Sequence, residues 1–181
     1  LDEVQTGMGH TGKLFAYEHY GITPDILSSA KALGGGFPVG AILTTDKIAP
    51  TFGPGTHGST FGGNPMACAV GSRAFDIINA PETLAHVKKQ GQKFQTTLRE
   101  LGEKTGVFKE VRGMGLLIGC VLADKYQGRA SEITAAALKH GLMVLVAGSD
   151  VVRFAPSLLL NDEDMAEGLK RLEAALTEWI A

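Results

Sequence analysis

The stretch Ser28-Ser29-Ala30-Lys31-Ala32-Leu33-Gly34-Gly35-Gly36-Phe37-Pro38 places one lysine among small and apolar residues, directly before three glycines. A lysine in such surroundings is easily desolvated, which keeps its amine neutral and available as a nucleophile. The glycines let the backbone approach a bulky ligand closely. The same pattern also suits a lysine whose ammonium simply reaches the solvent, so the rest of the chain has to decide between the two.

The composition of the 181-residue chain is that of an ordinary globular protein, with 44% hydrophobic and 20% charged residues. This is enough apolar material for one or two small cores. The net charge is -2, and Lys and Arg are spread along the chain, so no basic surface for nucleic acid is expected. No apolar run approaches the thickness of a bilayer, and the first residues lack the pattern of a signal peptide. We therefore expect a cytoplasmic protein that binds neither nucleic acid nor membranes.

The two cysteines, Cys68 and Cys120, lie among apolar or small neighbours. This favours buried free thiols in a reducing compartment over a disulfide framework. The five histidines never stand at ligand spacing with one another or with a cysteine, so we predict no metal site. The chain opens on Leu1-Asp2-Glu3-Val4-Gln5 without a Met, at the expected end of a strand, and we expect it to be cut from something longer.

Glycine is dense from Gly7 to Gly71 and sparser afterwards, which predicts two structural regions. In the first, short apolar segments at Ile26-Leu27 and 39–43 alternate with Gly and Pro turns, as expected of short strands buried in an α/β sheet. Helices are predicted over 65–78, 82–101 and 130–140, and strands over 108–111, 116–122, 142–146 and 151–154. A last helix is predicted to begin at an Asn161/Asp162 cap, which completes an α+β unit.

Two glycine-rich stretches invite a nucleotide-binding interpretation. Residues 7–13 satisfy G-x-x-x-x-G-K, but Leu14 stands where a P-loop needs Ser or Thr for magnesium, which favours a turn-rich loop. Residues 113–119 nearly match G-x-G-x-x-G, but they lead into an apolar strand instead of a helix. Their glycines are predicted to permit close backbone packing. A nucleotide-binding module is therefore the disfavoured alternative from another functional class.

Three stretches resemble, in the same order, the class III aminotransferases: Asp-Glu-Val-Gln-Thr-Gly at 2–7, Ala-Lys-Ala-Leu-Gly-Gly-Gly at 30–36, and His-Gly-Ser-Thr-Phe-Gly-Gly-Asn-Pro at 57–65. Within that class the chain is most similar to acetylornithine and succinylornithine aminotransferases, through residues 34–40, 111–119 and 152–156. The resemblance covers essentially the whole chain. It implies the α/β fold of pyridoxal-phosphate (PLP)-dependent transferases of fold type I. Residues 1–78 would form the C-terminal part of the large PLP-binding domain, and residues 79–181 the small C-terminal α+β domain.

The resemblance implies pyridoxal 5'-phosphate as the cofactor and Lys31 as the catalytic residue that holds it as a Schiff base and moves the substrate proton. Asp2 corresponds to the aspartate that keeps the pyridine nitrogen protonated, so that the ring acts as an electron sink. Gln5 corresponds to the residue that hydrogen-bonds the phenolic oxygen of the cofactor, and Glu3 and Val4 line the same turn. Without the motif, each would be an ordinary loop residue.

Three more residues receive a role from the resemblance. Thr60 corresponds to the residue that binds the cofactor phosphate across the interface of a homodimer, and Ser59 beside it would contact the substrate. Arg153 interrupts an apolar run, where a charge is costly unless it meets an anion. It corresponds to the arginine that holds the carboxylate of the amino acid or of 2-oxoglutarate. Alternatively, hydroxyls among glycines stabilise turns, and an arginine on an edge strand faces water.

The implied reaction moves the side-chain amino group of N2-acetylornithine or N2-succinylornithine to 2-oxoglutarate, giving the semialdehyde and glutamate in arginine metabolism. An aminotransferase acting on ornithine, 4-aminobutyrate or another ω-amino acid shares all these motifs and remains an alternative. A non-catalytic role for a chain that lacks half the pocket is another. Family members often have Arg where this chain has His10, and the glycine loop that cradles the phosphate has no counterpart here.

Overall fold

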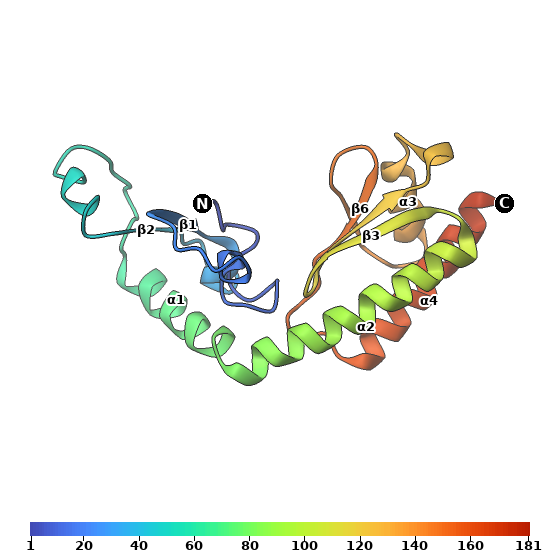
Figure 1. The fold of residues 1–181 in the computed structure, drawn as a ribbon, viewed down its shortest axis with the longest axis horizontal. Helices are drawn as coiled ribbons and strands as arrows, with labels where there is room; N and C mark the ends of the chain where they lie inside the picture. The colour runs from blue at the N-terminus through green and yellow to red at the C-terminus, as the bar shows by residue number, and fades with distance from the viewer. The chain divides into compact units, whose positions relative to one another are not determined.

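The strands and helices in Figure 1 come from a computed structural model that describes every residue from Leu1 to Ala181. They fall into two units, Leu1–Leu84 and Ala85–Ala181. The predicted boundary after residue 78 coincides with the end of helix α1 (Pro65–Ile78), whereas the division between the units falls within helix α2 (Pro81–Thr105).

The first unit is built around strand β1 (Ile26–Ser29), which pairs antiparallel with β2 (Ala41–Thr44). The first residues of the chain run parallel to β1 on its other side. The Ser28 amide donates to the Leu1 carbonyl at 3.0 Å, and the Glu3 amide donates to the Ser28 carbonyl at 2.9 Å. Side chains alternate along an extended segment, so Asp2 is exposed while Glu3 is buried.

Short helices connect these strands to α1. They are the 3-10 helices η1 (Ala16–His19), η2 (Lys31–Gly34) and η3 (Ala49–Thr51). Helix α1 begins as predicted, with Pro65 in its first turn and the Asn64 side chain accepting the Ala67 amide at 2.9 Å. The core of this unit is small, with Met8, Phe15 and Leu27 buried together.

One expectation for the first unit is wrong. Strand β2 is predicted to be buried, but Ile42 is 64% and Leu43 is 49% exposed. The reason is that β2 is an edge strand, with β1 as its single strand partner.

The second unit is an antiparallel sheet packed against helices, as the predicted α+β pattern requires. The strand order is β3 (Phe108–Met114), β4 (Leu117–Leu122), β6 (Val151–Phe154) and β5 (Leu145–Val146). Helices α2 and α4 (Asp162–Ile180) lie side by side on the sheet, and α3 (Ala130–Lys139) and η4 (Asp124–Tyr126) complete the unit (Figure 1). Alternate residues of β4, Ile118, Cys120 and Leu122, face the core.

The glycines at residues 113–119 permit close packing, as predicted. Gly115, with φ 55°, lies in the turn between β3 and β4, and Gly113, with φ 139°, pairs with Ile118 near the end of β3. The turn lies directly against α2, because a Cβ added to Gly91 would stand 2.2 Å from the Gly115 carbonyl oxygen. Helix and hairpin therefore touch backbone to backbone.

Three strand boundaries in the second unit differ from the prediction, since β3 ends at Met114 instead of residue 111 and β4 begins at Leu117 instead of residue 116. Strand β5 begins at Leu145 instead of residue 142, because the Leu142 amide donates to the Ala137 carbonyl at 2.9 Å and closes the end of α3. Gly141, with φ 73°, supplies the left-handed residue that this cap needs. The last helix begins as predicted, with the Asn161 side chain accepting the Asp164 amide at 2.7 Å.

The two thiols differ. Cys120 is buried as expected, but Cys68 is exposed on α1, so the prediction that both are buried is wrong for Cys68. Helix α1 buries Ala67 and Gly71, and Met66 near Cys68 is exposed as well, which the apolar sequence does not reveal. None of the helices combines the length and apolar character that crossing a membrane requires.

Candidate active site

Asp2, Gln5 and Lys31 lie together in the first unit although they are far apart in sequence. The parallel pairing of residues 1–3 with β1 places the Asp2–Gln5 turn beside the end of that strand. Lys31 follows β1 after a single residue, and its Nζ donates to Gln5 Oε1 at 2.7 Å. The structure thus joins the first two motifs into one cluster.

Lys31 has an unusual backbone conformation. Its φ is 49°, in the left-handed region that non-glycine residues rarely adopt, and only Met8 shares this feature. Strained residues of this kind cluster at functional sites, where the surrounding structure holds them in place. The side chain is exposed, so this chain alone does not supply the desolvation that the sequence suggested. Of the glycines after Lys31, Gly34 permits close packing, because a Cβ there would stand 2.8 Å from the Val39 side chain.

The Asp2 carboxylate is exposed and oriented by its own turn. Its Oδ1 accepts the Val4 amide at 2.9 Å, an Asx turn. Oδ2 makes no hydrogen bond within the chain and remains available as an acceptor. Val4 and Gln5 are half-buried in the same turn.

Glu3 differs from its neighbours, because its side chain points to the opposite side and is 3% exposed. Its carboxylate accepts the Tyr17 amide at 2.8 Å, the Ala16 amide at 3.1 Å and the Thr6 hydroxyl. Three donors from residues 6–17 thus converge on its two oxygens. The sequence did not single out Thr6, Ala16 or Tyr17, because no local spacing announces a contact across thirteen residues.

The stretch from Gly7 to Lys13 is the turn-rich loop that Leu14 predicts. The Gly9 amide donates to the Leu14 carbonyl at 3.1 Å, and the Gly12 amide donates to the Gly9 carbonyl at 2.9 Å. A P-loop cradles phosphate at the start of a helix, but the next helix here is the four-residue η1. The loop therefore lacks the geometry of a nucleotide-phosphate site.

Ser59 and Thr60 are not brought to the Lys31 cluster. Both are exposed in a turn where the Gly62 amide donates to the Ser59 carbonyl at 3.3 Å. Their segment, turquoise in Figure 1, extends away from β1 and β2. Their roles toward phosphate and substrate stay predictions.

Arg153 lies in the second unit, on β6. This strand has partners on both sides, with Gly119 of β4 and Leu145 of β5 opposite Arg153, so the residue is not on an edge strand. Its Nε is buried and has no hydrogen-bond partner. It borders a cavity of about 290 Å³ whose other walls are mostly apolar and include Met143, Leu145 and Pro156. A buried guanidinium donor without a partner fits an anionic ligand.

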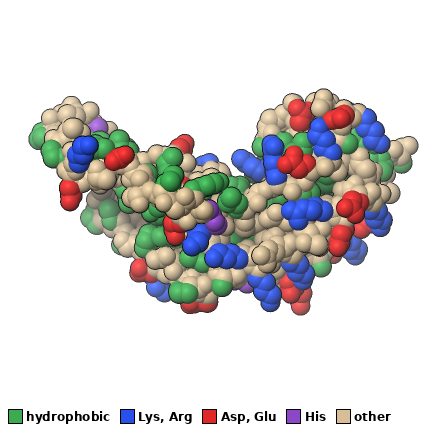
Figure 2. Space-filling view, viewed as in Figure 1, with side chains coloured by type: hydrophobic (Ala, Val, Ile, Leu, Met, Phe, Trp, Pro, Cys, Tyr) green, Lys and Arg blue, Asp and Glu red, His purple; other side chains and the backbone are tan.

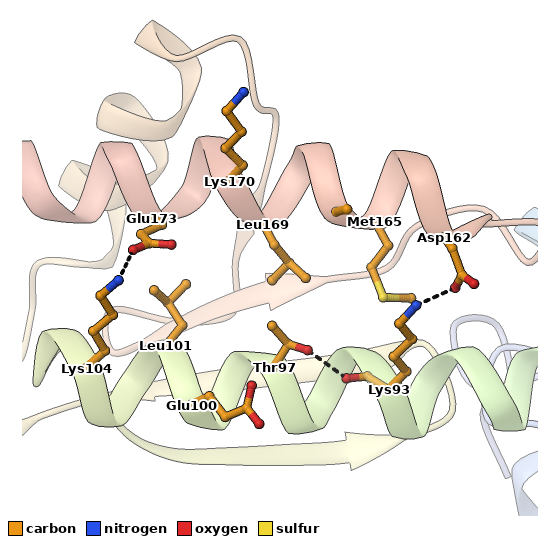
Figure 3. A pocket seen from close by; sticks show the side chains of 11 residues that line it. Lys93, Thr97, Glu100, Leu101, Lys104, Asp162, Met165, Leu169, Lys170 and Glu173 are labelled. Carbon is orange, nitrogen blue, oxygen red and sulfur yellow. Dashed lines mark hydrogen bonds and ion pairs between the residues drawn. The ribbon is translucent and has the colours of Figure 1, made fainter.

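A larger cavity, of about 450 Å³, lies between α2 and α4 and contains none of the predicted site residues (Figure 3). Four of its charged groups are paired, since Lys93 contacts Asp162 at 2.8 Å and Lys104 contacts Glu173. Glu100 and Lys170 also line it. The hydrogen bonds from Lys93 and Gln90 hold the pKa of Asp162 below its ordinary value. On the face drawn in Figure 2, Lys and Arg alternate with Asp and Glu. This cavity is a groove between helices, and most of its charged side chains are paired with one another.

The Lys31 cluster, which consists of Asp2, Gln5 and Lys31, contains the groups that the reactive part of pyridoxal phosphate requires. A lysine amine can attach the aldehyde, a carboxylate can pair with the ring nitrogen, and an amide can meet the phenolic oxygen. The phosphate has no partner among these three residues. The residues present therefore fit the reactive part of the cofactor.

Comparison with known proteins agrees with this geometry. Residues 1–176 match the family Aminotransferase class-III. The chain is 80% identical over 181 residues to the acetylornithine aminotransferase of Neisseria meningitidis serogroup B, covering all of this chain and 46% of that protein. It is 55% identical over 180 residues to the succinylornithine transaminase/acetylornithine aminotransferase of Pseudomonas aeruginosa, covering 99% of this chain and 44% of the relative.

The fold prediction is confirmed by a solved structure. The crystal structure of N-acetylornithine aminotransferase from Stenotrophomonas maltophilia matches with a TM-score of 0.91 and 46% identity, over 99% of this chain and 47% of that one. The chain thus spans about half the length of the relatives it matches. From the family match, the sequence identity and the shared fold together, the chain belongs to the class III aminotransferase family.

Proposed function

We propose that the enzyme to which this chain contributes is a PLP-dependent aminotransferase. It moves the side-chain amino group of N2-acetylornithine, or of N2-succinylornithine, to 2-oxoglutarate and gives the semialdehyde and glutamate. The observation that carries the proposal is the hydrogen bond between Lys31 Nζ and Gln5 Oε1, at 2.7 Å, beside the exposed Asp2 carboxylate. Three groups with the required chemistry meet there from two separate motifs.

Each residue of the cluster has one task in this proposal. When bound, the cofactor supplies an electron-withdrawing ring that stabilises negative charge at the substrate carbon. Lys31 attaches it and afterwards carries the proton at its Nζ, which requires a neutral amine. Asp2 keeps a proton on the ring nitrogen. Gln5 has both acceptor and donor groups, so its Oε1 holds the lysine amine while its Nε2 is left for the phenolic oxygen.

The remaining predicted residues extend the site beyond the cluster. Arg153 would hold a substrate carboxylate, because its buried Nε has no partner within the chain. Ser59 and Thr60 would serve substrate and phosphate in the second subunit of a homodimer. In this arrangement the first unit belongs to the large domain and the second is the small domain. Two free cysteines agree with a cytoplasmic location.

The acyl group on the ornithine substrate is a further part of the proposal. The relatives at 80% and 55% identity carry the names acetylornithine and succinylornithine in their descriptions. This supports an N2-acylated ornithine ahead of free ornithine or 4-aminobutyrate as the amino donor.

The visible absorption spectrum of the full-length enzyme with pyridoxal phosphate tests the proposal. We expect a band from cofactor attached to Lys31, which N2-acetylornithine or N2-succinylornithine bleaches more readily than ornithine or 4-aminobutyrate does. Lys31→Ala should lose the attached cofactor. Lys47→Ala, which removes an exposed lysine of the same unit, should keep it.

The outcomes separate the alternatives. A wild-type enzyme that forms no such band contradicts the assignment of Lys31. If the cofactor attaches normally but 4-aminobutyrate or ornithine bleaches the band faster, the cofactor chemistry stands and the proposed substrate is wrong.

A further inference from the structure

Glu3 stands between two proposed cofactor contacts and yet faces away from them. Asp2 and Gln5 are turned outward, toward the solvent and Lys31, while the Glu3 side chain is 3% exposed. A buried carboxylate is costly unless hydrogen bonds replace its water. The three hydrogen bonds that the carboxylate accepts all come from neutral donors, and no Lys or Arg forms an ion pair with it.

Those donors come from two places in the chain. The amides of Ala16 and Tyr17 belong to the first turn of η1, and their bonds to Glu3 measure 3.1 and 2.8 Å. The third donor is the Thr6 hydroxyl, directly after Gln5. One carboxylate therefore ties the turn that carries Asp2 and Gln5 to a helix thirteen residues away.

The backbone of Glu3 closes the same turn. Its amide donates to the Ser28 carbonyl at 2.9 Å, and its carbonyl accepts the Gly7 amide at 2.9 Å. A Cβ added to Gly7 would stand 2.6 Å from the Glu3 carbonyl oxygen, so the turn is too tight for any other residue there. The side chain and the backbone of Glu3 are thus both held by hydrogen bonds. This fixes the positions of Asp2 and Gln5 in the same turn.

We propose that Glu3 is a positioning residue that holds Asp2 and Gln5 in place for the cofactor, without contacting the cofactor through its own side chain. The inference rests on the proposed function. The positioning role requires a carboxylate at this position, because three hydrogen-bond donors converge on the Glu3 side chain. A glutamine has a single acceptor oxygen, and its amide nitrogen is a donor, so at least one amide of η1 would lose its partner.

The test uses the full-length holoenzyme with Glu3→Gln. We expect the affinity for pyridoxal phosphate to fall by roughly 10-fold to 100-fold, because small displacements of positioned groups have effects of that size. We also expect the pH midpoint of the visible band of the bound cofactor to shift, since Asp2 and Gln5 set the protonation of the ring. Equilibrium titration with cofactor and a spectral pH titration measure the two effects.

The matched control is Glu18→Gln. Glu18 accepts the Phe15 amide at 2.8 Å and so supports the same helix, but it does not reach the Asp2–Gln5 turn. This variant should stay within about twofold of wild type in cofactor affinity, because an exposed cap acts locally. Thr6→Val should reproduce part of the Glu3→Gln effect, and Thr6→Ser, which keeps the hydroxyl, should restore wild-type behaviour.

Three results would overturn the inference. A Glu3→Gln enzyme with a lowered melting temperature but wild-type cofactor affinity and spectral midpoint shows a purely structural role. If Glu3→Gln does not fold, wild-type affinity and midpoint in Thr6→Val lead to the same conclusion. A wild-type enzyme without any cofactor band overturns the proposed function itself, which is a separate and recognisable failure.

Discussion

The two units of the chain hold their residues in place by different means. In the second unit, one apolar cluster of eighteen buried residues joins all the strands of the sheet except β5 to all three α-helices. In the first unit, the buried cluster has three members, and large hydrophobic residues such as Phe61, Met66 and Ile42 are exposed. Packing of this extent favours the second unit as the more stable part of the chain.

The chemistry lies mostly in the less packed unit. Asp2, Gln5 and Lys31 are positioned by hydrogen bonds, by the buried Glu3 carboxylate and by left-handed backbone at Lys31. Arg153 is the exception, since it projects from an inner strand of the well-packed sheet. The comparison teaches that polar contacts orient the proposed reactive groups here, while apolar packing supplies the frame for Arg153.

The largest expected effect comes from breaking the packed unit at Gly91. Alanine there would bring its Cβ within 2.2 Å of the Gly115 oxygen and 2.4 Å of the Gly115 carbon, both backbone atoms that cannot rotate away. We expect Gly91→Ala to lower the free energy of unfolding by more than about 3 kcal/mol. Urea denaturation followed by the fluorescence of Trp179, the single tryptophan, reports on this unit because Trp179 packs on Tyr126.

Gly168→Ala is the matched control in the same unit. Its Cβ would meet Leu142 at an ordinary 3.7 Å, and the glycine lies inside α4. Alanine should therefore raise the stability by up to about 1 kcal/mol. Equal urea midpoints for both variants and wild type would contradict the close contact between helix and hairpin.

The second prediction compares the two thiols. Burial raises the pKa of Cys120 to about 12, although nearby Arg99 acts in the opposite direction. In the unfolded chain the thiol ionises near its ordinary value of 9.0, so the unfolded state loses its proton first. The stabilisation is complete below pH 9.0 and is lost as the pH rises toward 12, with a slope of about 1.4 kcal/mol per pH unit.

Thiol labelling and alkaline denaturation measure this difference. A thiol reagent at pH 8 should modify the exposed Cys68 in the native chain and reach Cys120 only when the second unit opens. The slope of the free energy of unfolding against pH above 9.0 should become shallower in Cys120→Ala and stay unchanged in Cys68→Ser. Rapid labelling of both thiols in the native chain would mean that the second unit is not closed around Cys120.

The sequence was sufficient where a local pattern determines the element. The helical periodicity from residue 65 predicted α1, and the Asn161/Asp162 cap predicted the start of α4, because helix caps and helical periodicity act over a few residues. The glycines at residues 113–119 likewise predicted close backbone packing, which occurs between Gly115 and Gly91. The strand predicted at 142–146 is too long, because its first amide closes a helix end by a contact that periodicity does not encode.

Prediction of the site depended on contacts distant in sequence. The motif order identified Asp2, Gln5 and Lys31 as candidates, and the parallel pairing with β1 then explained why they meet. The role of Glu3 was not predictable, because its partners Ala16 and Tyr17 contribute backbone amides, which leave no trace in the sequence. The sequence pattern around Lys31 suggested that its amine is desolvated. In this chain alone that prediction is wrong, because the Lys31 side chain is exposed.

The smallest expected effect concerns an interaction that occurs once in each unit, the asparagine cap at the start of a helix. Asn64 accepts the Ala67 amide at 2.9 Å at the start of α1, and Asn161 accepts the Asp164 amide at 2.7 Å at the start of α4. Replacing either by alanine should weaken its helix by about 1 kcal/mol, because the lost bond is local.

Hydrogen exchange of the α1 and α4 peptides should show faster opening of α1 in Asn64→Ala and of α4 in Asn161→Ala, with α1 starting from lower protection in wild type. Asn64→Asp keeps the acceptor oxygen and is the control. Equal protection of the two helices in wild type would contradict the inferred difference in stability between the units, whatever the size of the cap effects.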